Sequence, residues 1–155
     1  MDETAQWLTP EEQRAWRGFV RLHDKLVGRL SRMLQSESNM SAADFAVLVQ
    51  LTDVPEGRQR VLDLAQALEW EKSRMSHHVA RMAKRGLVVR EECPEDGRGA
   101  FVVITEEGRA AIEAAAPRHV EGVRELFLDH VTPAELRVLA AMSERVVGRM
   151  GEDQP

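Results

Sequence analysis

Residues 61–105 read VLDLAQALEW EKSRMSHHVA RMAKRGLVVR EECPEDGRGA FVVIT and decide the fold of this chain. Apolar residues at helical spacing predict a short helix over about 62–68 and a second over about 73–85, separated by a brief turn. Gly86 is suited to the left-handed position that ends a helix. Two apolar runs, 87–89 and 101–105, then predict strands joined by turn-forming residues 94–99. Helix, turn, helix and hairpin in this order predict a winged helix-turn-helix.

The second of these helices is basic in an acidic chain. The whole sequence of 155 residues carries a net charge of −5, yet there is no Asp or Glu between Lys72 and Arg90. Residues 60–98 hold eight basic and seven acidic side chains, a net charge of +1, which leaves −6 for the rest. This local reversal of sign predicts a polyanionic partner.

A helical projection separates the side chains of residues 73–85 into two faces. At about 100° per residue, Met75, Val79 and Met82 form a stripe typical of a buried face. We expect the opposite face to be basic, with Ser73 and Lys84 at its margin and five side chains on it: Arg74, His77, His78, Arg81 and Arg85. Arginine can pair with guanine and both Arg and Lys neutralise phosphate, so this face suits the major groove of DNA. The alternative is an ordinary solvated helix.

Short motifs around this helix resemble the multiple-antibiotic-resistance regulator (MarR) family. They are Lys84-Arg85-Gly86-Leu87-Val88 followed by Arg90, then Asp96-Gly97-Arg98-Gly99-Ala100, then Val103-Ile104-Thr105-Glu106-Glu107-Gly108. The order of elements resembles that family over nearly the whole chain. The resemblance implies an obligate homodimer of winged-helix subunits that binds palindromic operator DNA. It further implies that Arg98 enters the minor groove while Asp96 holds the tip of the wing. Many members release DNA when an aromatic or phenolic compound binds, and some when a cysteine is oxidised.

Apolar helices are expected on both sides of the winged module. Thr9-Pro10-Glu11-Glu12 predicts the start of a helix that runs to about Gln35, and Thr132-Pro133-Ala134-Glu135 repeats this pattern. Pro117 should kink or divide the helix that follows the wing. The sequence thus predicts a mainly α fold with a small β-hairpin wing, in three parts: an N-terminal dimerisation helix (1–40), the DNA-binding region (41–105) and C-terminal dimerisation helices (106–155). Two-fold symmetry would place the two reading helices about 34 Å apart.

We predict DNA contacts from the second helix and from the tip of the wing. The candidates are Lys72, Ser73, Arg74, Ser76, His77, His78, Arg81, Asp96 and Arg98. The hydroxyl groups near the start of the helix have an alternative role as helix caps.

A small-molecule site is a further expectation. An aromatic effector could bind in a crevice between the dimerisation arm and the reading head, lined by Trp16, Phe19, His23 and Phe45, although plain core packing is the alternative. The five histidines lack the i, i+4 spacing of helical zinc ligands, so we expect no metal and no cofactor.

These patterns predict a dimeric DNA-binding regulator rather than an enzyme, and the resemblance implies that it is a repressor of nearby genes. One alternative is a winged-helix module for protein interaction that has lost DNA binding, because Glu91, Glu92 and Glu95 would oppose phosphate. Another is a redox-responsive regulator acting through Cys93, the single cysteine. No signal peptide or apolar run long enough for a bilayer is evident, so a cytoplasmic location is expected.

Overall fold

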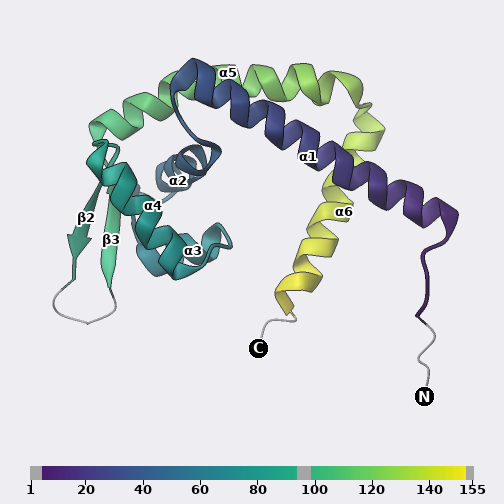
Figure 1. Ribbon diagram of the computed structural model, residues 1–155, viewed down its shortest axis with the longest axis horizontal. Helices are drawn as coiled ribbons and strands as arrows, with labels where there is room; N and C mark the ends of the chain where they lie inside the picture. Colours follow the sequence, from purple (N-terminus) through teal and green to yellow (C-terminus); the bar gives the residue numbers. More distant parts are fainter. Residues whose placement is uncertain (1–4, 94–98, 153–155) are drawn as a thin grey trace. The chain divides into compact units, whose positions relative to one another are not determined.

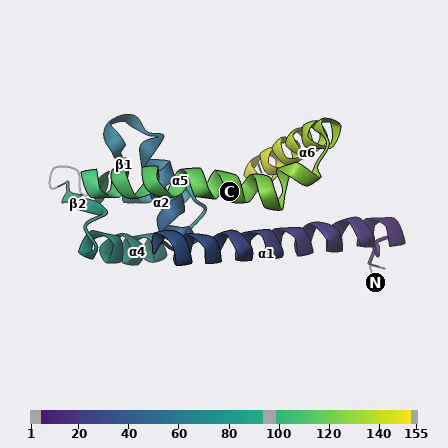
Figure 2. The same ribbon diagram turned by 90° about the horizontal axis from the view of Figure 1, so that it is seen from above.

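The computed structural model describes residues 5–93 and 99–152. Its elements in chain order are α1 (Pro10–Ser38), α2 (Ala42–Thr52), η1 (Pro55–Gly57), β1 (Arg58–Arg60), α3 (Val61–Ala67), α4 (Lys72–Lys84), β2 (Val88–Glu92), β3 (Ala100–Ile104), α5 (Glu106–Leu126), η2 (Leu128–His130) and α6 (Pro133–Glu152). Figures 1 and 2 show this mainly helical chain with its small sheet, as the sequence predicts. The chain divides into two compact units, Met1–His119 and Val120–Pro155.

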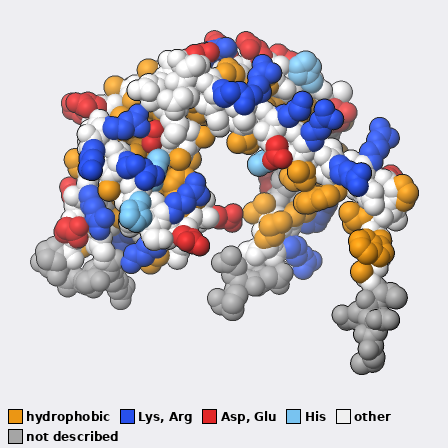
Figure 3. Space-filling model, in the orientation of Figure 1, with side chains coloured by type: hydrophobic (Ala, Val, Ile, Leu, Met, Phe, Trp, Pro, Cys, Tyr) orange, Lys and Arg blue, Asp and Glu red, His pale blue; other side chains and the backbone are white. Residues whose placement is uncertain are grey.

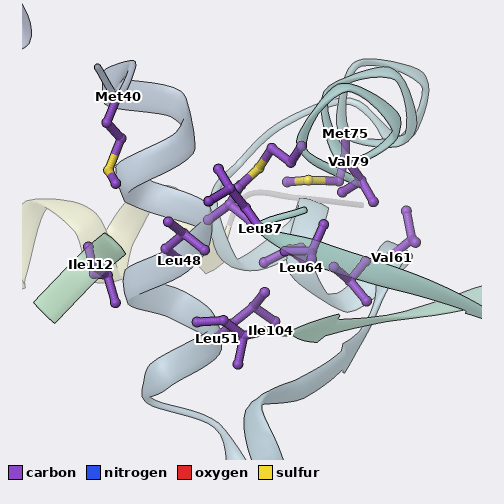
Figure 4. Packing of buried hydrophobic residues seen from close by; sticks show 14 of the residues in the cluster. Met40, Leu48, Leu51, Val61, Leu64, Met75, Val79, Leu87, Ile104 and Ile112 are labelled. Atoms are coloured by element: carbon purple, nitrogen blue, oxygen red, sulfur yellow. The ribbon is translucent and has the colours of Figure 1, made fainter. Parts of the chain in front are cut away.

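The winged module lies in the first unit and has a continuous apolar core. Leu48 and Leu51 of α2, Leu64 of α3 and Met75 of α4 are all fully buried. Figure 4 shows these side chains pointing toward one another and toward Ile104 of the wing. Every helix of the module therefore contributes to one core, which fixes α4 relative to α2 and the sheet.

The wing is a three-stranded antiparallel sheet in the order β1-β3-β2. Val88 faces Ile104 and Glu92 faces Ala100 across the β2–β3 hairpin, while Arg60 of β1 faces Phe101. The short strand β1 thus adds a third strand to the hairpin at the base of the wing. Alternate residues of β3, namely Ala100, Val102 and Ile104, are buried, so one face of the sheet packs on the core.

Thr105 joins the wing to α5 and does so with its hydroxyl group. Thr105 Oγ1 donates to the Gly86 carbonyl (2.6 Å) and accepts from the backbone N–H of Gly108 (2.9 Å). A Cβ at position 108 would collide with the Leu87 carbonyl, so the close approach requires glycine there. Gly86 has φ +77°, the left-handed conformation that the sequence predicts. These contacts explain why Gly86, Thr105 and Gly108 occur together in the sequence.

Helix α1 begins as predicted but ends later. Thr9 and Glu12 form a reciprocal capping box, and the helix continues three residues beyond Gln35 to Ser38. Only Leu34 of its side chains is buried. Several large apolar side chains nearer its N-terminus are exposed, including Trp16, Phe19, Leu22 and Val27.

Helix α5 runs from Glu106 to Leu126 as one element, with Pro117 inside it. Pro117 is exposed, so water can reach the carbonyl group that loses its partner. The expected helix after Thr132 is confirmed: Glu135 N–H donates to Thr132 Oγ1, and Thr132 N–H donates to the Glu135 carboxylate. Exposed apolar side chains line this helix, α6: Leu136, Val138, Met142, Val146, Val147 and Met150.

Candidate nucleic-acid interface

Helix α4 presents a polar, cationic face to solvent. Its buried side is formed by Met75, His78, Val79 and Met82. Ser73, His77 and Lys84 are exposed and lie within about 40° of one another around the helix axis. Arg74 and Arg81 are exposed on one flank of this set, and the small Ala80 lies on the other. Figure 3 shows the basic and histidine side chains gathered over this part of the molecule. We call Ser73, Arg74, His77, Arg81 and Lys84 the outer face of α4.

Lys84 was expected only at the margin of the basic face. The structure exposes it between Ser73 and His77 in helical projection, with no acidic residue of α4 beside it. Projecting the whole helix around its buried side would have assigned Lys84 to the candidate contacts.

Three further candidates lie in the first two turns of α4. Lys72 and Ser73 are exposed and Ser76 is half-buried. The N-cap is Glu71, which makes no side-chain cap bond, so neither serine hydroxyl is the cap. Both remain available for phosphate near the positive end of the helix dipole.

The placement of His78 on the outward face is wrong, whereas Arg85 is exposed but is paired within the protein. His78 is only 9% exposed, and its Nε2 atom lies 2.9 Å from Asp44 Oδ1 of α2. Arg85 is directed to the same carboxylate, with Nη1 donating to Asp44 Oδ2 at 2.6 Å and Nη2 donating to the Asn39 carbonyl at 2.8 Å. The physical reason is angular: His78 is only about 40° from Met82 around the helix, so it borders the buried stripe.

Asp44 is therefore the buried centre of a polar cluster that joins α2 to α4. Its carboxylate also accepts the Ser41 N–H, and its own N–H donates to Ser41 Oγ, a capping box for α2. Burial alone would raise the pKa of Asp44, but the hydrogen bonds from Arg85 and Ser41 outweigh it and lower this pKa. Asp44 stays ionised, and its carboxylate contacts both the buried His78 of α4 and the exposed Arg85 that follows this helix.

Trp70 is a functional candidate that the sequence analysis missed. The guanidinium of Arg74 lies 4.0 Å from the centre of the Trp70 ring, a cation–π contact. The ring of His78 also contacts Trp70, in an edge-on arrangement with the two ring centroids 5.5 Å apart. Trp70 therefore links an exposed arginine of the outer face to the buried cluster around Asp44.

The described part of the wing neutralises much of its own charge. Glu91 pairs with Arg58 of β1 (3.3 Å) and Glu92 with Arg90 (3.1 Å). The guanidinium groups of Arg58 and Arg60 both lie over the Phe101 ring, at 4.0 and 4.6 Å. Asp96 and Arg98, the predicted contacts at the tip, lie outside the described residues.

The four residues predicted to line an effector crevice fall into separate surroundings. Trp16 and Phe19 contact each other on α1 (centroids 6.0 Å apart), and His23 pairs with the adjacent Asp24. Trp16 borders a shallow groove of about 450 Å³ with Arg17, Val20, Arg21, Asp24 and Lys25. Phe45 instead packs on His119 of α5, with ring centroids 4.4 Å apart.

His119 marks a small cavity between α1 and α5. The cavity measures about 10 Å³, roughly the space of one water molecule, and is lined by Leu30, Met33, Leu34, Ser38, Ala115, Arg118 and His119. Burial lowers the pKa of His119. The ring is therefore neutral near pH 7 and packs as an aromatic side chain.

The remaining predictions concern the Cys93 thiol, metal-binding sites and membrane-spanning helices. Cys93 is a free, half-buried thiol. Within residues 5–93 and 99–152, no group of three or more His, Cys, Asp or Glu side chains could hold a metal ion. In the same part of the chain, no helix is long and apolar enough to cross a bilayer.

Comparison with known proteins identifies the family. A model described as MarR family matches residues 38–99, which include α2, α3, α4 and β2 and end just before β3. The solved structure of AbsC, a MarR family transcriptional regulator from Streptomyces coelicolor, superposes with a TM-score of 0.90 at 36% identity, covering 96% of this chain and 100% of that one. This chain belongs to the MarR family of transcriptional regulators.

Two further relatives support this assignment. Sco3205, a MarR family regulator from Streptomyces coelicolor solved in complex with DNA, is 37% identical with a TM-score of 0.88, covering 94% of this chain and 91% of that one. The transcriptional regulator HosA of Escherichia coli is 28% identical over 131 residues, which cover 84% of this MarR-family chain and 95% of HosA. The likeness therefore extends through the flanking helices as well as the winged module.

Proposed function

We propose that this MarR-family chain is a dimeric regulator that binds palindromic operator DNA through the outer face of α4 and represses nearby genes. The observation that carries the proposal is the exposure of Arg74, His77, Arg81 and Lys84 on a helix without acidic residues. Such a helix can enter the major groove, where arginine and lysine contact guanine edges and phosphate. Binding of DNA by the similar Sco3205 supports the same assignment.

The dimer is supported by the apolar side chains that one chain leaves exposed. On α6, Val138, Val146 and Val147 are 66%, 44% and 61% exposed. The N-terminal part of α1 exposes Trp16 (59%) and Phe19 (52%). Figure 3 shows apolar side chains at the surface of both helices. Exposed apolar patches of this kind are usual where a second chain binds.

Relief of repression by a small aromatic or phenolic compound is the finer part of the proposal. The Phe45–His119 ring pair beside the small cavity is a suitable apolar and aromatic lining, whereas the present cavity holds about one water. An effector would therefore have to displace side chains there, and this displacement is how it would alter the winged module. Salicylate, as a probe, should raise the melting temperature and lower DNA affinity; an unchanged affinity at millimolar salicylate would argue against this class of effector.

DNA binding is tested with the intergenic fragment beside the gene and a coding fragment of equal length. Affinity for the intergenic fragment should fall steeply as salt rises, because each neutralised phosphate releases a counterion. The double variant Arg81→Ala/Lys84→Ala should bind about tenfold or more weakly. Its matched control is Arg29→Ala/Arg32→Ala, which removes two exposed arginines of α1 and should leave affinity within about twofold.

Binding that is insensitive to salt, or equal in the two double variants, would contradict this function. It would favour the protein-interaction module instead. That alternative loses support in the described wing, because Glu91 and Glu92 are already paired with arginines. A redox function has only the single thiol Cys93 behind it, and Cys93→Ser should leave DNA binding unchanged under oxidant.

A further inference from the structure

His78 connects a buried carboxylate to an exposed arginine of the outer face of α4. On one side its Nε2 atom lies 2.9 Å from Asp44 Oδ1, although this contact is not aligned as a full hydrogen bond. On the other side, Arg81 Nη2 lies 3.3 Å from His78 Nδ1. Arginine can only donate, so Nδ1 must be the unprotonated acceptor and the ring must carry its proton on Nε2. The two contacts thus define one neutral tautomer of His78.

The ring cannot turn freely away from this arrangement. Trp70 meets it edge-on, and His78 is nine-tenths buried. Asp44 is itself held by Arg85 and by its capping box with Ser41. The position of the Arg81 guanidinium is therefore tied, through one imidazole, to a carboxylate that the fold has fixed.

We propose that His78, anchored on Asp44, is a positioning residue for Arg81, and that specific DNA binding requires His78 to be neutral. The inference rests on the proposed function, in which Arg81 contacts DNA. Protonation of Nδ1 would convert the acceptor into a donor and place a positive charge beside Arg81. Arg81 would then lose its support and move away from the bound geometry.

The charged groups around His78 have opposing effects on its protonation. Asp44 from α2 favours the charged ring, whereas Arg74 and Arg81 from α4 oppose it, and Arg85 acts by neutralising Asp44. Burial is the largest effect and, with the arginines, lowers the pKa of His78. A groove of about 410 Å³, bordered by Gln35, Asn39, Ser41, Asp44, His78, Arg81 and Arg85, gives water a route to the cluster. Protonation in mildly acid solution is therefore sterically feasible.

Two substitutions separate positioning from mere packing. In His78→Gln the side-chain amide can donate to Asp44 and accept from Arg81, but it cannot titrate. In His78→Phe the ring shape is retained without either polar contact. The matched control is His130→Gln, which removes an exposed imidazole outside both the Asp44 cluster and the outer face of α4.

The experiment measures affinity for the intergenic fragment between pH 7.5 and 5.5 at constant ionic strength. His78→Gln should match the native chain at pH 7.5 and hold its affinity at pH 5.5. The native chain and His130→Gln should weaken there severalfold, by less than about tenfold, because burial lowers the pKa of His78 below its ordinary value of 6.5. His78→Phe should be weak throughout. Long-range ¹⁵N NMR of the free native chain should show the Nε2–H tautomer of His78.

Superimposable pH profiles for the native chain and His78→Gln, or an Nδ1–H tautomer, would overturn the positioning role while leaving the proposed function intact. Absence of DNA binding at every pH would overturn both. If His78→Phe fails to fold, the comparison of His78→Gln with the native chain and His130→Gln still decides the question.

Discussion

The winged module and the terminal helices treat their apolar side chains in opposite ways. In the module, Leu48, Leu64 and Met75 are inaccessible to solvent within a single chain. On α6, Val138 and Met150 are 66% and 64% exposed, and on α1 Trp16 is 59% exposed. The module therefore has a complete core of its own, whereas the apolar faces of α1 and α6 require another surface. The difference shows that a single chain can form the core of the winged module but cannot bury the apolar side chains of α1 and α6.

The largest effect is expected inside the module, where no second chain can compensate. Leu48→Ala should lower the free energy of unfolding by about 2–5 kcal/mol, because it leaves a cavity in a fully packed core. Urea denaturation at one fixed protein concentration measures it. The matched control is Leu62→Ala in α3, whose side chain is 43% exposed and whose loss should change stability by less than about 1 kcal/mol. Equal losses for the two variants would mean that the module is not the closed core described above.

Negative charges introduced on α6 should dissociate the proposed dimer and leave the winged module folded. Val138→Asp/Val146→Asp places two carboxylates on one exposed apolar stripe of α6, so light scattering should show the mass falling toward that of a single chain. The control, Ala141→Asp/Gly148→Asp, adds the same charge on the other side of α6, where a Cβ at position 148 meets no atom within 4 Å. A dimer that survives the first pair would remove α6 from the interface.

The wing tip should affect DNA binding alone. Arg98→Ala should weaken binding to the intergenic fragment by about tenfold or more, because a minor-groove arginine is lost, while mass and thermal stability stay unchanged. Arg29→Ala on α1 is the control for removal of one exposed positive charge. Unchanged affinity of the Arg98→Ala variant would disprove the role of the tip.

The smallest effect concerns the pH dependence of stability. Burial lowers the pKa of His119, so the unfolded chain takes up protons more readily than the folded chain once the pH falls below about 6.5. The free energy of unfolding should thus decrease as the pH falls below this value. His119→Phe should remove part of this decrease and leave the part that is due to His78. Thermal denaturation between pH 7.5 and 5.5 tests this, with His130→Phe as an exposed control. Parallel profiles for the His119→Phe variant and the native chain would refute it.

The sequence predicted local structure well wherever the determinants are local. The capping box of Thr9 and Glu12, the left-handed Gly86 and the pairing of two strands in a hairpin follow from neighbouring residues, and each is confirmed. The end of α1 at Ser38 was missed because a helix ends where its cap forms, here at the left-handed Asn39.

The candidate site was predicted less completely because its cluster joins residues distant in sequence. No feature of the sequence near His78 or Arg85 indicates that both contact Asp44, which lies 34 or more positions earlier. Helical projection alone could have placed His78 beside the buried stripe and Lys84 within the exposed face. Both errors arose because the exposed face was centred too close to Arg85. The contacts of Trp70 with Arg74 and His78 required the fold itself.

The central claim is that two chains, joined through their terminal helices, hold two outer faces of α4 on one duplex. The most direct measurement is the mass of the complex with the intergenic fragment, by native mass spectrometry or sedimentation. The account predicts two chains of 17.5 kDa on each duplex, and two chains in the free protein. A complex of full affinity that contains a single chain per duplex would contradict it.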